Sequence, residues 1–259
     1  MAKYINSFKE TVSKQLNWQH FDLNNADLVN LLEVNVVELD NITRTILCAD
    51  ETRPRILQLK AGYILILRAI NLNLNATPED MVSIRFFVTE NNIYSFSKRR
   101  LKAIDDMREL LKQKNELNNS EEFVLLFVNC LLNSLTPFMQ DLAEQIEQIE
   151  DKIIAERIAD NRQKILTLRK QIFTIKRYLR PQNEVLNLLK KDYFQSIKNK
   201  KHLAQNIDHH LRFIEDFELY LAKLNLLKDE LSNIVTDKLT RNSYIIPNPI
   251  FKPIFILQF

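Results

Sequence analysis

The chain contains a single glycine, Gly62, among its 259 residues. Glycine supplies most positive-φ turns and most places where the backbone approaches a ligand closely, so a chain with one glycine has few tight turns and favours helix. It cannot form the glycine-rich loops that hold phosphates, and it contains no GxGxxG, GxxxxGK[ST] or GxSxG motif. The sequence therefore predicts a mostly helical protein that is not an enzyme.

The rest of the composition is typical of a folded protein from a reducing compartment. Charged residues make up 27% and apolar residues 46% of the chain, which is enough apolar surface for a core. Cys48 and Cys130 are far apart and belong to no CxxC motif, and the polar N-terminus has no apolar signal region. We therefore expect a cytoplasmic protein.

The first hundred residues mix strand and helix patterns. Residues 26–39 repeat apolar side chains at helical spacing after two asparagines, which are good N-caps. Three other segments are rich in the β-branched and aromatic residues that favour strands. Two of them contain turn residues, and asparagine in the second of these turns tolerates positive φ. They predict a strand at Trp18–Leu23, a hairpin at Arg55–Leu72 turning at Ala61-Gly62, and a hairpin at Met81–Lys98 turning at Glu90-Asn91-Asn92. These elements form an α/β or α+β unit.

From Leu101 onward the pattern is helical. Residues 101–114 are amphipathic, and Asn119 and Glu122 have the spacing of a capping box at the start of the next helix, which continues past Pro137. A further helix should kink or restart at Pro181, because proline cannot donate the backbone hydrogen bond of a helix interior.

The last helical segment, about Lys201 to Tyr244, repeats apolar residues at alternating spacings of three and four over four heptads, as in a coiled coil. At about 1.5 Å per residue it spans roughly 65 Å, so we expect a stalk that protrudes or lines an assembly. The predicted seam comprises Leu203, Ile207, His210, Ile214, Phe217, Leu221, Leu224, Lys228, Leu231 and Val235.

Charge is segregated along these helices. Residues 141–160 and 208–237 are acidic, whereas residues 162–201 are strongly basic. We interpret the blocks as neighbouring helix faces that attract one another. The alternative is a helical interaction module whose basic block 162–201 binds an acidic partner or nucleic acid, with an affinity that falls steeply with salt. The apolar seam inside the basic block favours packing, so no nucleic acid is expected.

Four segments carry a resemblance to a known family. They read "ADETRPRILQL", "LILRAINLNLNATPEDMVSIRFFV", "SKRRLKAIDDMRELL" and "IKRYLRPQNEVLNLL", and they occur in the family order between Trp18 and Tyr244. Together they resemble the cytoplasmic part of the CorA-type divalent-cation transporters, in particular the zinc-transporting, ZntB-like branch.

The resemblance implies a fold, a function and partners. It implies an α+β fold in which an α/β/α domain (residues 1–135) is followed by long helices ending in the stalk helix (136–244). It also implies a homopentamer whose five stalks form a funnel that binds zinc or magnesium and regulates or feeds a pore. Such a protein acts on the cytoplasmic side of the inner or plasma membrane and associates with itself through the stalk.

Residues 245–259 depart from the family pattern. They are apolar but contain three prolines and Lys252, whereas a membrane-spanning helix needs about 20 apolar residues. The Gly-Met-Asn motif of the family pore is absent, because Gly62 is the only glycine. We therefore expect a divergent tail that is not a transmembrane span, in a chain truncated before the first transmembrane helix. Contact with the membrane would be made only through the missing C-terminal spans.

Candidate metal ligands cluster on the predicted stalk and are chosen by charge and position, not by a family motif. Copies of the stalk brought together would arrange these side chains in rings that suit a borderline cation such as zinc. His210, on the apolar seam, and His20, in a strand, are expected to be structural. The ligands predicted for a divalent cation are Asp208, His209, Glu215 and Asp216, with Asp50 and Glu51 as weaker candidates.

Overall fold

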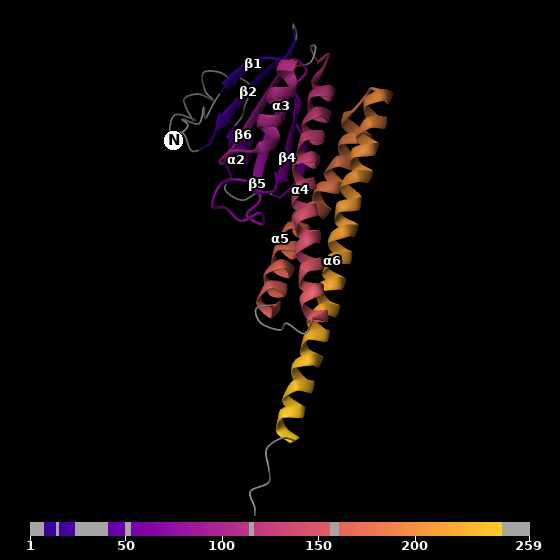
Figure 1. The fold of residues 1–259 in the computed structure, drawn as a ribbon. Helices are drawn as coiled ribbons and strands as arrows, with labels where there is room; N and C mark the ends of the chain where they lie inside the picture. Colours follow the sequence, from indigo (N-terminus) through magenta and orange to yellow (C-terminus); the bar gives the residue numbers. More distant parts are fainter. Residues whose placement is uncertain are drawn as a thin grey trace, which may run out of the picture.

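The computed structural model describes residues 8–13, 16–23, 41–49, 53–113, 117–155 and 161–244. They form an elongated molecule with a β-sheet at one end and a last helix that extends beyond the others at the opposite end (Figure 1). The combination of a mixed sheet with long helices confirms the predicted α+β class. The elements are β1 (Phe8–Thr11), β2 (Asn17–Asp22), α2 (Asn41–Cys48), β3 (Arg55–Gln58), β4 (Tyr63–Ala69), β5 (Val82–Val88), β6 (Asn92–Ser97), α3 (Lys102–Gln113), α4 (Ser120–Ile154), α5 (Asn161–Leu188), the π-helical turn η1 (Leu189–Tyr193) and α6 (Ile197–Tyr244).

The six described strands form one sheet in the order β1-β2-β6-β5-β4-β3. β2 and β6 pair in parallel, with His20 opposite Ser95, and the other neighbouring strands pair antiparallel. Because β5 runs against both β6 and β4, the strands β2, β6 and β4 point the same way. Their carboxyl ends therefore lie at the same end of the sheet.

Helices cover both faces of the sheet. In β4, Ile64 and Ile66 point to one face, and Leu65 and Leu67 to the other, as the two-residue period of a strand requires. The first face packs with Leu47 of α2, and the second forms the main core with α3 and α4. This is the α/β/α arrangement that the resemblance implied.

Both predicted hairpins are present, and the first turns within residues 59–62, which include the predicted Ala61-Gly62. Gly62 has no positive φ; a Cβ there would lie 2.0 Å from the carbonyl oxygen of Val88, so glycine is needed for close packing. The expectation of a positive-φ asparagine in residues 90–92 is wrong. The hydroxyl of Thr89 closes that turn instead, donating to the carbonyl oxygen of Asn92 (2.9 Å) and accepting from its N–H (3.0 Å).

The long helices follow the sequence pattern closely. The side chain of Asn119 caps α4 by accepting from the N–H of Glu122 (3.0 Å), as predicted, but the Glu122 carboxylate accepts from the N–H of Asn118 (2.9 Å). α4 continues through Pro137, and α5 continues through Pro181 without restarting. The interruption comes later, at η1, before α6 begins.

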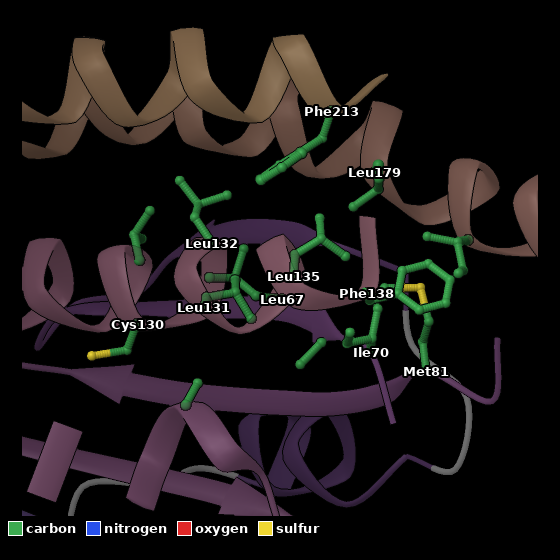
Figure 2. Packing of buried hydrophobic residues seen from close by; sticks show 14 of the residues in the cluster. Leu67, Ile70, Met81, Cys130, Leu131, Leu132, Leu135, Phe138, Leu179 and Phe213 are labelled. Carbon is green, nitrogen blue, oxygen red and sulfur yellow. The ribbon is translucent and has the colours of Figure 1, made fainter. Parts of the chain in front are cut away.

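The main core fills the space between the sheet and α6, with α4 in the middle. Figure 2 shows Leu131 of α4 directed toward the strands and Leu132 directed toward Phe213 of α6. By length and composition α4 is the one described helix that can cross a membrane, but 61% of its most apolar window is buried in the protein. Burial against the sheet explains its apolar sequence.

The predicted seam of α6 packs inside the same chain. Its members from Leu203 to Leu231 are buried against α4 and α5, with the exception of the exposed Lys228. Val235 is 38% exposed, and the helix beyond Leu231 stands clear of the bundle (Figure 1). The coiled-coil pattern therefore describes intramolecular packing for most of the length of α6.

Some predictions fall outside the described residues or stay untested. The helix expected at residues 26–39 and the tail 245–259 are not among the residues that the structure describes. The boundary predicted between residues 135 and 136 falls within α4, whose two halves contribute to one core. The division into domains stays a prediction.

Candidate cation-binding stalk

Two of the predicted ligands form a line on the outer face of α6. An α-helix turns by about 100° per residue, so Asp208 and Glu215, seven residues apart, face the same way about 10 Å from each other. Both side chains are exposed. Asp208 accepts a hydrogen bond from Arg212 one turn below it (2.7 Å), an exposed pair that solvent screens. This face points away from the seam that α6 buries against α4 and α5.

The other two predicted ligands lie on an adjoining face that is turned toward α4. His209 and Asp216 are half-buried, and the ring of His209 packs on Phe213 with centroids 4.5 Å apart. Burial, together with the charges of Asp216 and of Glu147 from α4, raises the pKa of Tyr220. Asp216 therefore lies near the α4–α6 contact.

A single copy of the chain does not bring the four residues together. No group of three or more histidine, cysteine, aspartate or glutamate side chains that can hold a metal occurs within the described ranges. Each face of α6 offers two ligands, and a stable zinc site takes about four. Asp50 and Glu51 lie outside the described residues. A cation site made from these residues requires more than one copy of α6.

Ion pairs between helices account for part of the basic block. Lys176 and Arg180 of α5 both contact Glu218 of α6, with 2.8 Å between Lys176 and the carboxylate. Hydrogen bonds from these two cations lower the pKa of Glu218. Lys223 of α6 contacts Glu150 of α4 at 2.6 Å. The α5–α6 contacts agree with the interpretation of the charge blocks as attracting helix faces. The Lys223–Glu150 pair does not bear on it, because both residues lie in acidic blocks.

A buried polar contact that sequence reasoning missed joins the sheet to α6. His210 is fully buried, and its Nε2 lies 3.4 Å from the side-chain nitrogen of Gln182 on α5. Gln182 accepts a hydrogen bond from the N–H of Arg68 on β4 (2.7 Å). Burial and the neighbouring His209 lower the pKa of His210 to about 4, so its ring is neutral and structural at neutral pH. No local pattern marks Gln182, because its partners are distant in sequence.

A second missed contact fixes the top of α6. The carboxylate of Glu121, in the first turn of α4, accepts from the N–H groups of Gln195 and Ser196 and from the side chain of Asn199. These donors lie at the start of α6, just after η1. Acidic side chains in the first turn of a helix usually stabilise their own helix, so no sequence pattern indicates this role.

The fold and the stalk define a class of protein: an α/β/α domain on a helical bundle whose last helix projects and carries outward-facing acidic residues. The family model described as "CorA-like Mg2+ transporter protein" matches residues 13–246. The chain therefore belongs to the CorA family. These proteins are transporters, which confirms the prediction that the chain is not an enzyme.

Individual relatives agree with this assignment. The zinc transport protein ZntB of Yersinia enterocolitica is 30% identical over 234 residues, which cover 90% of this chain and 71% of that protein. The full-length CmaX structure matches with a TM-score of 0.83 at 26% identity, covering 91% of this chain and 73% of that one. The ZntB cytoplasmic domain from Vibrio parahaemolyticus has the same fold, with a TM-score of 0.74 at 24% identity over 90% of this chain and 93% of that one.

Proposed function

We propose that this chain is the cytoplasmic domain of a divalent-cation transporter and that α6 lines the ion pathway when several copies assemble around a common axis. The carrying observation is the outer face of α6, where Asp208 and Glu215 are exposed, aligned and directed away from their own bundle. In a symmetric assembly each residue becomes a ring of carboxylates. Such rings attract cations and raise their local concentration.

The same face of α6 supports self-association. Leu219 and Leu226 are 63% and 71% exposed, and they lie seven residues apart on the side that carries Asp208 and Glu215. Exposed leucines gain free energy when neighbouring helices bury them. We propose a ring of identical chains, and the family resemblance makes that ring a pentamer.

The ligand types bear on which cation is bound. Carboxylates alone suit magnesium, whereas an imidazole beside carboxylates suits zinc. His209 and Asp216 on one copy can complete a site with Asp208 and Glu215 on its neighbour, because the two faces adjoin. In this proposal zinc is the preferred cation and magnesium the competitor. The domain lies on the cytoplasmic side of the inner membrane, with α6 directed toward it.

Titration calorimetry of the chain with zinc and with magnesium tests the proposal. The double variant Asp208→Ala/Glu215→Ala should lower zinc affinity at least tenfold. A matched control, Glu144→Ala/Asp151→Ala, removes two exposed carboxylates with the same seven-residue spacing from α4 and should leave affinity unchanged. Absence of saturable heat, or equal losses in both double variants, would show that the outer face of α6 is not the site.

A further inference from the structure

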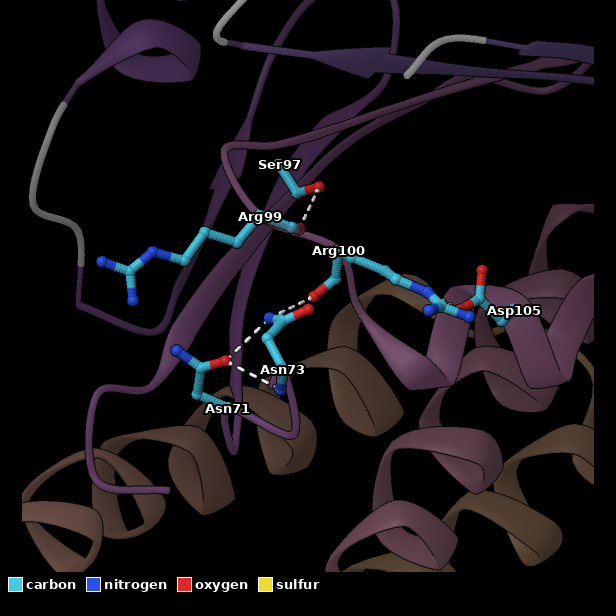
Figure 3. A network of polar contacts seen from close by, with 6 residues as sticks. All are labelled: Asn71, Asn73, Ser97, Arg99, Arg100 and Asp105. Carbon is cyan, nitrogen blue, oxygen red and sulfur yellow. Dashed lines mark hydrogen bonds and ion pairs between the residues drawn. The ribbon is translucent and has the colours of Figure 1, made fainter. Parts of the chain in front are cut away.

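Two exposed basic residues near the sheet are held by contacts within the chain. Arg100 contacts Asp105 at 2.6 Å, and Arg99 lies 3.7 Å from Asp80. The turn that carries them is tied to the loop after β4, because Nδ2 of Asn73 donates to the carbonyl oxygen of Arg100 (3.1 Å; Figure 3). These arginines therefore offer little charge to a partner. Several basic residues of α5 differ from them.

An exposed stripe of basic and apolar side chains runs along α5. Its members recur at spacings of three or four residues, so they share one side of the helix, away from the seam that packs in the core. The α5 stripe consists of Arg162, Leu166, Lys170, Phe173 and Arg177. Leu166 is 46% and Phe173 56% exposed. Among the described residues, no acidic side chain pairs with Arg162, Lys170 or Arg177. Packing within the chain therefore leaves this part of the basic block unused.

The direction and composition of the α5 stripe favour a protein partner. α5 packs along α6, so the stripe runs along the helical bundle (Figure 1). With α6 directed toward the membrane, as in the proposed function, the stripe stands upright and does not lie on a lipid surface. Leu166 and Phe173 separate the basic residues with apolar surface that a protein can bury. The partner that fits carries acidic side chains around apolar ones.

A surface of this kind occurs on the other side of α6, where it adjoins α4. Lys223 of α6 contacts Glu150 of α4 there (2.6 Å). Four further residues lie within two helical turns of this pair and on its side of each helix. This α4/α6 surface comprises Glu147, Ile154, Asp216 and Tyr220. Ile154 is 75% exposed, so the surface has an apolar part as well as two acidic side chains.

Contacts inside the chain fix the heights of the three helices relative to one another. Lys176 of α5 contacts Glu218 of α6, and Lys223 of α6 contacts Glu150 of α4, so the members of each pair lie at one height along the bundle. α5 runs against α6, whereas α4 runs in the same direction as α6. At about 1.5 Å per residue, these pairs give the heights of the other residues.

These heights place complementary side chains of the two surfaces at the same level. The level pairs are Arg177 with Asp216, Phe173 with Tyr220, and Leu166 with Ile154, each to within about one residue, or 1.5 Å. By the same heights, Glu147 lies between the levels of Lys170 and Arg177. Neighbours in a ring around an axis parallel to α6 stay at one height. The α5 side of one copy therefore meets the α4 side of the next with opposite charges and apolar groups matched.

We propose that the α5 stripe of each copy docks on the α4/α6 surface of the next copy in the ring. Phe173 packs on Tyr220 of the next copy, and Arg177 lies beside its Asp216 and Glu147. The contact is head-to-tail, so it closes into a ring and buries the exposed apolar side chains of both surfaces. This inference rests on the ring of the proposed function and adds the side contact that holds its members together.

Sedimentation equilibrium of the zinc-free chain, carried to high chain concentration, measures this contact apart from the cation site. We expect concentration-dependent association that Arg177→Glu and Asp216→Arg each weaken roughly tenfold, because each brings like charges together. The double variant Arg177→Glu/Asp216→Arg should recover association to within about fivefold of wild type. Phe173→Ser should also weaken association about tenfold. The control Lys164→Glu reverses an exposed charge on the other side of α5 and should change it less than about twofold.

The possible outcomes separate this contact from the cation site. Circular dichroism verifies the folding of each variant, in which only exposed or half-buried side chains change. Wild type that stays monomeric at every concentration, equal weakening by Lys164→Glu and Arg177→Glu, or no recovery in the double variant would overturn the proposal. A monomer that binds phosphatidylserine vesicles through Arg177 would overturn it in favour of a membrane. The expected association pattern without saturable zinc binding would support this contact and refute the cation site.

Discussion

Replacing Glu121 with alanine should loosen the attachment of α6 to the rest of the protein. The carboxylate accepts from two backbone N–H groups and one side-chain amide at the start of α6, at 3.2 Å for Ser196 and 3.0 Å for Asn199. A hydrogen bond to a charged group contributes about 1.5–3 kcal/mol. Gln195 is exposed, so water replaces part of the loss. Ser196 still caps the helix by accepting from the N–H of Asn199. We therefore expect a total cost of about 3 kcal/mol.

Urea unfolding and amide hydrogen exchange measure this loss. Glu121→Ala should lower the free energy of unfolding by about 3 kcal/mol and speed exchange at residues 195–200 on the order of a hundredfold. Glu121→Gln keeps one acceptor and should lose about half as much. The control Glu144→Ala removes an exposed carboxylate from the same helix and should change stability by less than about 0.5 kcal/mol. Equal effects of Glu121→Ala and Glu144→Ala would refute the anchoring role.

Three further perturbations have defined outcomes. His20 and His210 have pKa values of about 4 when folded and 6.5 when unfolded, so as pH falls the unfolded chain takes up their protons first. The contribution of these histidines to stability is therefore unchanged above pH 6.5, falls between 6.5 and 4 by up to about 3 kcal/mol per histidine, and levels off below 4. Urea midpoints between pH 7 and 4, compared with those of His210→Gln, check it. Gly62→Ala places a Cβ 2.0 Å from the carbonyl oxygen of Val88 and should lower the free energy of unfolding by about 2–3 kcal/mol in the same assay. An unchanged free energy of unfolding would show that the backbone of the hairpin shifts without cost. Asn119→Ala removes the cap of α4 and should cost about 1 kcal/mol, restored in part by Asn119→Ser.

Much of the fold is predictable from local patterns. Both hairpins, the capping residue Asn119 and the buried positions of α6 from Leu203 to Leu231 follow from propensity, spacing and periodicity. The turn at residues 89–92 differs from the prediction. An asparagine with positive φ was expected to form it, whereas the hydroxyl of Thr89 closes it with two hydrogen bonds.

The partner of the α6 seam is less predictable. A heptad pattern states which side of a helix is buried, but not whether α4, α5 or another copy covers it. In this fold, α4 and α5 cover the seam down to Leu231. The same limit explains why the roles of Glu121 and Gln182 were not predicted. Their partners are distant in sequence and come close only when the whole chain folds.

The candidate cation site is predictable only in part. Helical geometry places Asp208 with Glu215 and His209 with Asp216, and their burial in the structure agrees with two separate faces. Whether a second copy completes the site depends on assembly, which a single chain does not contain.

The solution mass of the chain, measured by light scattering with and without zinc, tests the central claim most directly. If α6 lines an ion pathway between copies, zinc should shift the mass from that of one chain toward that of five, and Asp208→Ala/Glu215→Ala should prevent the shift. Magnesium should act more weakly. A mass that stays at one chain at every zinc concentration, or a shift that the double variant undergoes equally well, would contradict the account.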